Sequence, residues 1–245
     1  MTNAIQTTDL AKVFGTKTAV SKLNLSVREG ELFALLGLNG AGKTTTIKML
    51  TCLSRPTSGD ALVLGDSIVS SPYSVKEKIN VSPQETAVAR NLSARENLEM
   101  IAGLHGSDRS TAQTQADEML SAFGLVEVAG DKAKRLSGGM QRRLSIAMAL
   151  ISKPQVLFLD EPTLGLDVLA RRELWSAIEV LKGGVTIMLT THYMEEAEAL
   201  SDRIGIMVKG ALKAVGTSAE LISLTGAKTF EDAFVALATE SGTSE

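Results

Sequence analysis

A short glycine-rich segment, residues 37–44, constrains the fold of this chain more than any other feature. Its sequence, GLNGAGKT, matches the pattern G-x-x-x-x-G-K-[ST]. The apolar residues 32–36 precede it, and a helical pattern with Ile47 and Leu50 on its apolar face follows it. Glycines allow backbone N–H groups to surround phosphate oxygens, and the N-terminus of the following helix adds positive potential. The segment therefore predicts a strand, loop and helix that bind the phosphates of a nucleoside triphosphate.

Two side chains of this loop have specific expected roles. Lys43 is expected to reach the β- and γ-phosphates, and the hydroxyl of Thr44 can bind Mg²⁺. A glycine-rich turn with an exposed lysine is the alternative, which the flanking strand and helix patterns disfavour. The residues expected to contact the nucleotide here are Gly37, Leu38, Asn39, Gly40, Ala41, Gly42, Lys43, Thr44 and Thr45.

Two further apolar runs, residues 156–159 and 185–189, end in polar clusters. Short continuous apolar runs separated by helical patterns indicate a buried parallel sheet. Ligands of such sheets bind at the carboxyl ends of the strands, which is where the polar clusters fall. The clusters are Asp160-Glu161 and Thr190-Thr191-His192. The pattern predicts an α/β protein with a mainly parallel sheet.

Other segments indicate a second kind of structure. Alternation and turn residues predict antiparallel strands over residues 23–27, 61–64, 204–208 and 211–215, the last two as a hairpin. Residues 86–152 contain helical patterns and no strand signal, with a capping-box pattern at Ser93 and Glu96.

We therefore expect a single domain, residues 1–245, with three parts. Residues 1–85 and 153–220 form the α/β core with an N-terminal antiparallel β subdomain. Residues 86–152 form an inserted α-helical subdomain. Residues 221–245 form a short C-terminal helix and a tail, of which residues 239–245 are expected to be frayed.

Asp160 and Glu161 are adjacent carboxylates at the end of a predicted buried strand. Neighbouring side chains on an extended chain point to opposite sides, so the two are expected to have different tasks. Asp160 can hold Mg²⁺, directly or through water, and Glu161 can polarise an attacking water. Alone, such a pair usually marks a strand that meets solvent, but beside a phosphate-binding loop it indicates hydrolysis.

Residues 136–140, LSGGM, precede a helix whose apolar positions include Leu144 and Met148. A serine and two glycines at a helix start offer a hydroxyl and free N–H groups, which can form a second anion site. An ordinary serine N-cap is the alternative that this segment leaves open when it is considered alone.

Composition limits the partners and the compartment. The chain has 28 acidic and 25 basic residues, a net charge of -3 and 4% aromatics, so it offers neither a basic field nor stacking platforms for nucleic acid. A single cysteine, Cys52, excludes an internal disulfide and fits a reducing compartment. We see no secretory signal and no apolar run near the roughly 20 residues of a membrane-spanning helix. We expect a cytoplasmic protein that does not bind nucleic acid.

In their order and spacing, these motifs resemble those of the nucleotide-binding subunit of ATP-binding cassette (ABC) transporters. The resemblance covers nearly the whole chain and includes Gln84, Leu166-Asp167 and His192. The wider segments SGGMQRRL and THYMEEAE are similar to the subfamily whose ATPase and permease are separate chains, including drug and nodulation-factor exporters. The resemblance implies a P-loop NTPase (RecA-like) core, ATP and Mg²⁺ as ligands, and ATP hydrolysis coupled to transmembrane transport.

The resemblance also implies roles for single residues. Phe14 matches the aromatic that stacks on adenine, although the family more often has tyrosine there and a simple hairpin residue is the alternative. Gln84 matches the glutamine that touches Mg²⁺ and senses the permease, and His192 matches the switch histidine near the γ-phosphate. Met140 replaces the commoner glutamine, as is usual in the drug-exporter type. Further nucleotide contacts are implied for Ser137, Gly138, Gly139 and Asp167, and catalytic roles for Lys43, Glu161 and His192.

Two partners follow from the resemblance. The segment LSGGM, residues 136–140, matches the signature of the family. One chain has one phosphate loop and one signature, so ATP held by one chain is expected to be capped by the signature of a second chain, head to tail. An integral membrane permease would hold the chain at the inner face of the cell membrane, with export as the expected direction. The alternatives are a soluble ABC-type ATPase of translation or DNA repair, and a P-loop scaffold without catalysis. Soluble translation factors usually join two cassettes in one chain, and repair proteins insert a long coiled coil. A scaffold without catalysis conflicts with the presence of both Glu161 and His192.

Overall fold

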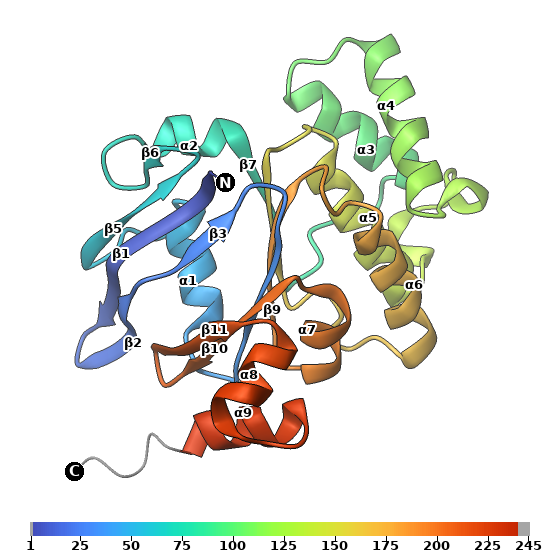
Figure 1. Cartoon of the computed structure of the whole chain (residues 1–245). Helices are drawn as coiled ribbons and strands as arrows, with labels where there is room; N and C mark the ends of the chain where they lie inside the picture. Colours follow the sequence, from blue (N-terminus) through green and yellow to red (C-terminus); the bar gives the residue numbers. More distant parts are fainter. Residues whose placement is uncertain (1, 240–245) are drawn as a thin grey trace.

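The computed structural model describes residues 2–239 and contains two β-sheets with helices on both sides of the larger one (Figure 1). The larger sheet has six strands in the order β11-β10-β4-β9-β8-β7. Five of them are parallel, and β11 pairs antiparallel with β10 at one edge. Its strands are β4 (Leu32–Leu36), β7 (Ile79–Ser82), β8 (Val156–Asp160), β9 (Thr186–Thr191), β10 (Arg203–Val208) and β11 (Ala211–Gly216).

The smaller sheet is antiparallel and is built from the N-terminal part of the chain. It has five strands in the order β2-β1-β5-β6, with β3 pairing to β1 as well. The strands are β1 (Asn3–Phe14), β2 (Lys17–Leu23), β3 (Ser26–Arg28), β5 (Ser58–Val63) and β6 (Asp66–Ser67). The segment expected as one strand over 23–27 is instead divided between β2 and β3. Asn24 lies in the break, where its side chain accepts from the N–H of Asp9 at 2.8 Å.

The central strands of the larger sheet are buried along their whole length because both faces are covered. In β4 the side chains alternate between two apolar clusters: Leu32, Ala34 and Leu36 belong to one, and Phe33 and Leu35 to the other. The first cluster lies against the later helices, α5 (Gly138–Leu150), α6 (Val168–Glu179) and α7 (Met194–Leu200) among them. The second lies against α1 (Lys43–Leu50), α2 (Pro72–Lys78) and the smaller sheet.

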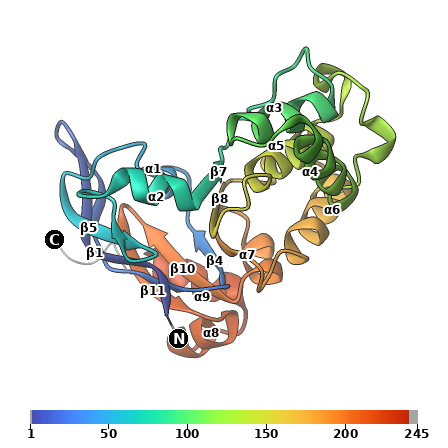
Figure 2. The same ribbon diagram turned by 90° about the horizontal axis from the view of Figure 1, so that it is seen from above.

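The inserted helices form an arm beside the sheets (Figure 2). It contains α3 (Ala94–Leu104), α4 (Arg109–Ala122) and two short 3₁₀ helices, η1 (Val126–Val128) and η2 (Ala133–Arg135), and α5 connects it to the larger sheet. Ser93 and Glu96 form the expected capping box at the start of α3. An isolated bridge between Ser93 and Lys132 is the one piece of β structure described within residues 86–152.

The C-terminal part differs from expectation. Two helices form there, α8 (Ser218–Thr225) and α9 (Phe230–Thr239), and Gly226 ends the first at a φ of 68°. A left-handed glycine after the last turn is a common way for a helix to stop. Thr239 lies in α9, not in a frayed tail, and residues 240–245 fall outside the described part. Within residues 2–239, no helix combines the length and apolar character that a membrane crossing requires.

Candidate functional site

The glycine-rich loop connects β4 to α1, as its sequence predicts, and two of its glycines are pressed against neighbouring strands. A Cβ at Gly37 would lie 2.3 Å from the carbonyl oxygen of Met207, and one at Gly42 would lie 2.4 Å from that of Ala19. Gly42 also has a φ of 106°, which side chains rarely tolerate. The loop is therefore held between β10 and β2 in a conformation that only glycine permits at these points.

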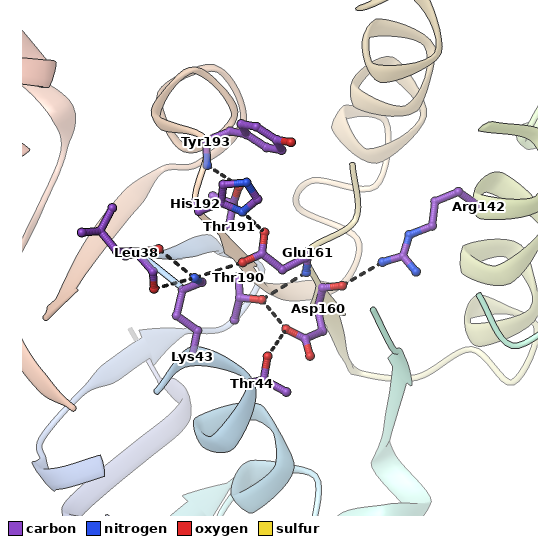
Figure 3. Close-up of polar contacts among 11 residues, drawn as sticks. Leu38, Lys43, Thr44, Arg142, Asp160, Glu161, Thr190, Thr191, His192 and Tyr193 are labelled. Atoms are coloured by element: carbon purple, nitrogen blue, oxygen red, sulfur yellow. Dashed lines mark hydrogen bonds and ion pairs between the residues drawn. The ribbon is translucent and has the colours of Figure 1, made fainter. Parts of the chain in front are cut away.

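Lys43, the first residue of α1, is buried and turns back over the loop (Figure 3). Its Nζ donates to the carbonyl oxygens of Gly37 at 2.7 Å and Leu38 at 3.3 Å. It also lies 3.0 Å from Oε1 of Glu161, whose side chain is as deeply buried. The ammonium is thus held at the centre of the loop beside a carboxylate from the end of β8.

Asp160 is the last residue of β8, and its side chain contacts Thr44 on α1. Its Oδ1 accepts from the hydroxyl of Thr44 at 3.1 Å and from that of Thr190, on β9, at 2.6 Å. Among residues 2–239, no three His, Cys, Asp or Glu side chains gather as a metal cage would require. A hydroxyl and a carboxylate are nevertheless hard oxygen donors, which suit Mg²⁺ when phosphates and water complete its coordination. The donor set therefore fits the ion in company with a nucleotide.

Glu161 directly follows β8 and contacts two functional side chains. Its Oε1 faces Lys43, and its Oε2 lies 2.7 Å from Nδ1 of His192, which follows β9. We expected Asp160 and Glu161 to point to opposite sides, as neighbouring residues of an extended chain do. This expectation is wrong, because the backbone at Glu161 is not extended: its φ is 49°, in the left-handed region. Its N–H donates to both the carbonyl and the hydroxyl oxygen of Thr190, each at 3.1 Å, which holds this turn in place. Both carboxylates therefore face the start of α1 while contacting different residues.

The ring of His192 contacts Tyr193, which in turn contacts Arg171. The rings of His192 and Tyr193 have centroids 4.0 Å apart, and the guanidinium of Arg171, on α6, lies 4.6 Å from the centroid of Tyr193. These contacts restrict the histidine ring, which Glu161 orients through Nδ1.

Lys43, Glu161 and His192 open onto a cavity of about 500 Å³, which Asp160, Arg171 and Tyr193 do not line. This volume lies within the range of about 300 to 1,000 Å³ that is usual for small-molecule sites. Phe14 lies at the hairpin between β1 and β2 with 53% of its surface exposed, and Gln84 follows β7. The predicted residues that line the cavity are Phe14, Asn39, Gly40, Ala41, Gly42, Lys43, Thr44, Thr45, Gln84, Glu161 and His192. An apolar ring at the mouth and a cation with helix N–H groups at the base fit a nucleotide.

The predicted signature residues lie elsewhere. Ser137 caps α5, its hydroxyl accepting from the N–H of Met140 at 3.2 Å, and both Ser137 and Gly138 are exposed. A Cβ at Gly138 would meet no atom within 4 Å, whereas one at Gly139 would lie 2.8 Å from the Cβ of Ala170 on α6. Asp167 caps α6, accepting from the N–H of Ala170 at 2.9 Å. Within the described chain, none of Ser137, Gly138, Gly139 and Asp167 lines the cavity.

Several polar residues beside the site had no predicted role. Thr190 belongs to the polar cluster at a strand end, so the sequence predicts its place beside the site. The sequence does not predict its hydrogen bond with Asp160. Arg142 and Glu196 lie on helices without such a signal, and both are buried. Burial raises the pKa of Glu196, and hydrogen bonds that include one from Trp175 at 3.2 Å only partly offset it. Their burial depends on tertiary packing, which a single sequence does not reveal.

Together, the parallel sheet, the phosphate loop at a strand end and the two carboxylates of β8 define a P-loop nucleoside triphosphatase. Residues 20–164 match the family model described as ABC transporter. The chain is 42% identical over 226 residues to the daunorubicin/doxorubicin resistance ATP-binding protein DrrA of Streptomyces peucetius, covering 92% of this chain and 68% of that protein. It is also 42% identical to the linearmycin resistance ATP-binding protein LnrL of Bacillus subtilis, over 92% and 73% of the two chains.

A solved structure gives the same result. A dimeric post-hydrolysis structure of an ATP-binding cassette bound to ADP and Pi is similar at 25% identity with a TM-score of 0.78, covering 87% of this chain and 98% of that one. The chain therefore belongs to the ABC transporter family. The α/β fold with its antiparallel sheet, and the activity of an ATP-binding, ATP-hydrolysing subunit, are confirmed as predictions.

Proposed function

We propose that this chain powers export through a separate membrane permease, with ATP hydrolysed at the cavity between the phosphate loop and the end of β8. The observation that best supports hydrolysis at this cavity is that Lys43 and His192 both contact Glu161, at 3.0 and 2.7 Å respectively. The two relatives are drug-resistance ATP-binding proteins, which favours transport over a role in translation or DNA repair.

Each residue of the site has a proposed task. Lys43 and the loop N–H groups bind the β- and γ-phosphates, Phe14 packs on the adenine, and Thr44, Asp160 and Gln84 hold Mg²⁺. Mg²⁺, when bound, neutralises phosphate charge.

Glu161 accepts the proton of the attacking water or orients that water, because it is a buried carboxylate beside the γ-phosphate end of the loop. His192 contacts Glu161 and steadies the γ-phosphate. The charge of Lys43, held in a buried site with little water, stabilises the charge that develops on phosphate oxygens more strongly than it would in solution.

The active unit is proposed to be a head-to-tail dimer. Ser137 and Gly138 are exposed at the start of α5, outside the cavity of their own chain, so they are free to cap ATP held by a partner. Gly139 acts differently, because its lack of a side chain lets α5 pack against Ala170. The solved cassette with ADP and Pi is itself dimeric, which supports this arrangement.

The permease would hold the chain at the inner face of the cell membrane, and Gln84, exposed after β7, would sense it. Co-purification with the permease encoded by a neighbouring gene, followed by ATPase assays with candidate substrates, tests this part. Drug-stimulated hydrolysis that requires the permease is the expected result. An ATPase that binds no membrane protein and responds to ribosomes or DNA would overturn it.

A further inference from the structure

Arg142, on the helix that follows the signature, is buried with 4% of its surface exposed. Within the described part of the chain it forms no ion pair; its guanidinium instead donates to main-chain carbonyl oxygens. Nε donates to Pro162 at 2.8 Å and Nη2 to Asp160 at 2.9 Å, as Figure 3 shows for Asp160. Nη1 donates to Pro83 and, at 3.4 Å, to Gln84. A buried cation is thus satisfied by four backbone oxygens.

This environment leaves Arg142 charged at neutral pH. Burial lowers its pKa to about 10, and the negative charges of Asp160 and Glu196 offset part of that effect. A guanidinium has its N–H donors in a rigid planar fork, so four acceptors around it are held in fixed relative positions.

The acceptors belong to the segments on which hydrolysis is proposed to depend. Asp160 and Pro162 are the residues on either side of Glu161, while Pro83 and Gln84 follow β7. Glu161 has the left-handed φ of 49°, a conformation that persists only where surrounding contacts enforce it. Thr190 accepts from the N–H of Glu161. Arg142 donates to the carbonyl oxygens of the two flanking residues, Asp160 and Pro162.

We infer that Arg142 is a positioning residue for ATP hydrolysis: it fixes the backbone around Glu161 to the signature helix α5 and to the loop of Gln84. Ser137 and Gly138 lie at the start of the same helix, little more than one turn before Arg142. A displacement of α5 is therefore transmitted directly to the catalytic carboxylate. The inference rests on the proposed role of Glu161.

A simple packing role for Arg142 is the competing explanation, and the same helix face provides a matched control. Ser145 lies three residues further along α5, is buried, and exchanges a hydrogen bond of 3.1 Å with Ser82 at the end of β7. Ser145→Ala removes a buried contact between α5 and the sheet edge without touching the segment around Glu161.

The test compares Arg142→Lys, Ser145→Ala and Glu161→Gln in the full chain, measuring kcat and KM for ATP, ADP affinity by calorimetry, and melting temperature. Lysine keeps the charge but has no planar fork, so it cannot hold the four carbonyls together. We expect Arg142→Lys to lower kcat at least tenfold with KM and ADP affinity within twofold of wild type. Ser145→Ala should melt at a lower temperature and keep kcat within twofold.

The inference is overturned if Arg142→Lys keeps kcat within twofold of wild type while Glu161→Gln is inactive, or if Ser145→Ala loses as much turnover as Arg142→Lys. If Glu161→Gln itself turns over normally, the proposed catalytic role fails instead. Should Arg142→Lys not be recovered folded, Arg142→Gln, which places no unpaired charge in the interior, replaces it with the same expected values.

Discussion

Replacement of Glu161 by glutamine tests whether its contact with Lys43 stabilises the folded chain as well as serving catalysis. The two side chains are 7% and 5% exposed, and their charged atoms are 3.0 Å apart. Removing one partner of such a buried pair costs about 3 to 5 kcal/mol, because the remaining charge is left without compensation. Glutamine keeps an oxygen that can accept from Lys43, so we expect roughly half of that cost, about 2 kcal/mol.

Thermal unfolding without nucleotide measures this cost. For a chain of this size, 2 kcal/mol corresponds to a fall in Tm of roughly 4 to 8 °C. ATP with Mg²⁺ should raise the Tm of Glu161→Gln more than that of the wild type, since phosphate oxygens then supply the missing negative charge beside Lys43.

The partly exposed ion pair between Lys78 and Asp66 provides the control. Its atoms are only 2.6 Å apart, but its side chains are 33% and 29% exposed. Ion pairs that remain in contact with water contribute about 0 to 1 kcal/mol, so Asp66→Asn should change Tm by no more than a few degrees. An unchanged or raised Tm for Glu161→Gln would refute the reasoning, and equal falls for both variants would show that burial is not what makes the contact important.

Three other predictions follow from the site. Lys43→Ala should weaken ATP binding by about 10- to 150-fold in calorimetry, since a charge-assisted contact is worth about 1.5 to 3 kcal/mol; unchanged affinity would contradict the role given to the loop. Gly42→Ala should lower both Tm and ATP affinity, because its Cβ would lie 2.4 Å from a carbonyl oxygen at a φ of 106°, whereas Gly103→Ala, with open space around it, should not. Burial raises the pKa of Glu196 above its ordinary 4.5, so its protonated form favours folding, and that stability is lost as pH rises above 4.5 through the folded pKa. Glu196→Gln should therefore gain Tm relative to wild type from pH 5 to pH 8, and a pH-independent difference would argue against a buried ionisable group.

The parts of the fold that depend on local pattern could be predicted from the sequence. Residues 37–44 need no distant information, because the glycines and the flanking apolar runs specify strand, loop and helix together. The capping box at Ser93 is likewise local and formed as expected, and Ser137 forms the N-cap that was left open as the alternative for its segment. The strand-end clusters identified Asp160, Glu161 and His192 as neighbours, because parallel strands bring their carboxyl ends to one edge.

What the sequence did not predict depends on packing between distant segments. The left-handed turn at Glu161 follows from contacts with Thr190 and Arg142, neither of which is near it in the chain. An arginine in a helix usually meets solvent, so nothing local distinguishes Arg142 from the exposed cations nearby. The break at Asn24 and the stop at Gly226 depend on single residues within otherwise continuous patterns, and such boundaries are difficult to place from pattern alone.

The central claim, an ATPase that closes head to tail, is tested most directly by light scattering with ATP and Mg²⁺. Glu161→Gln should bind ATP without turnover and accumulate as a dimer. Adding Gly138→Asp should return it to a monomer, because the new carboxylate would face the γ-phosphate of the partner in a poorly screened interface. The fold should accept this change, since a Cβ at Gly138 meets no atom within 4 Å. A double variant that still dimerises with ATP would contradict the account and favour a self-contained P-loop enzyme.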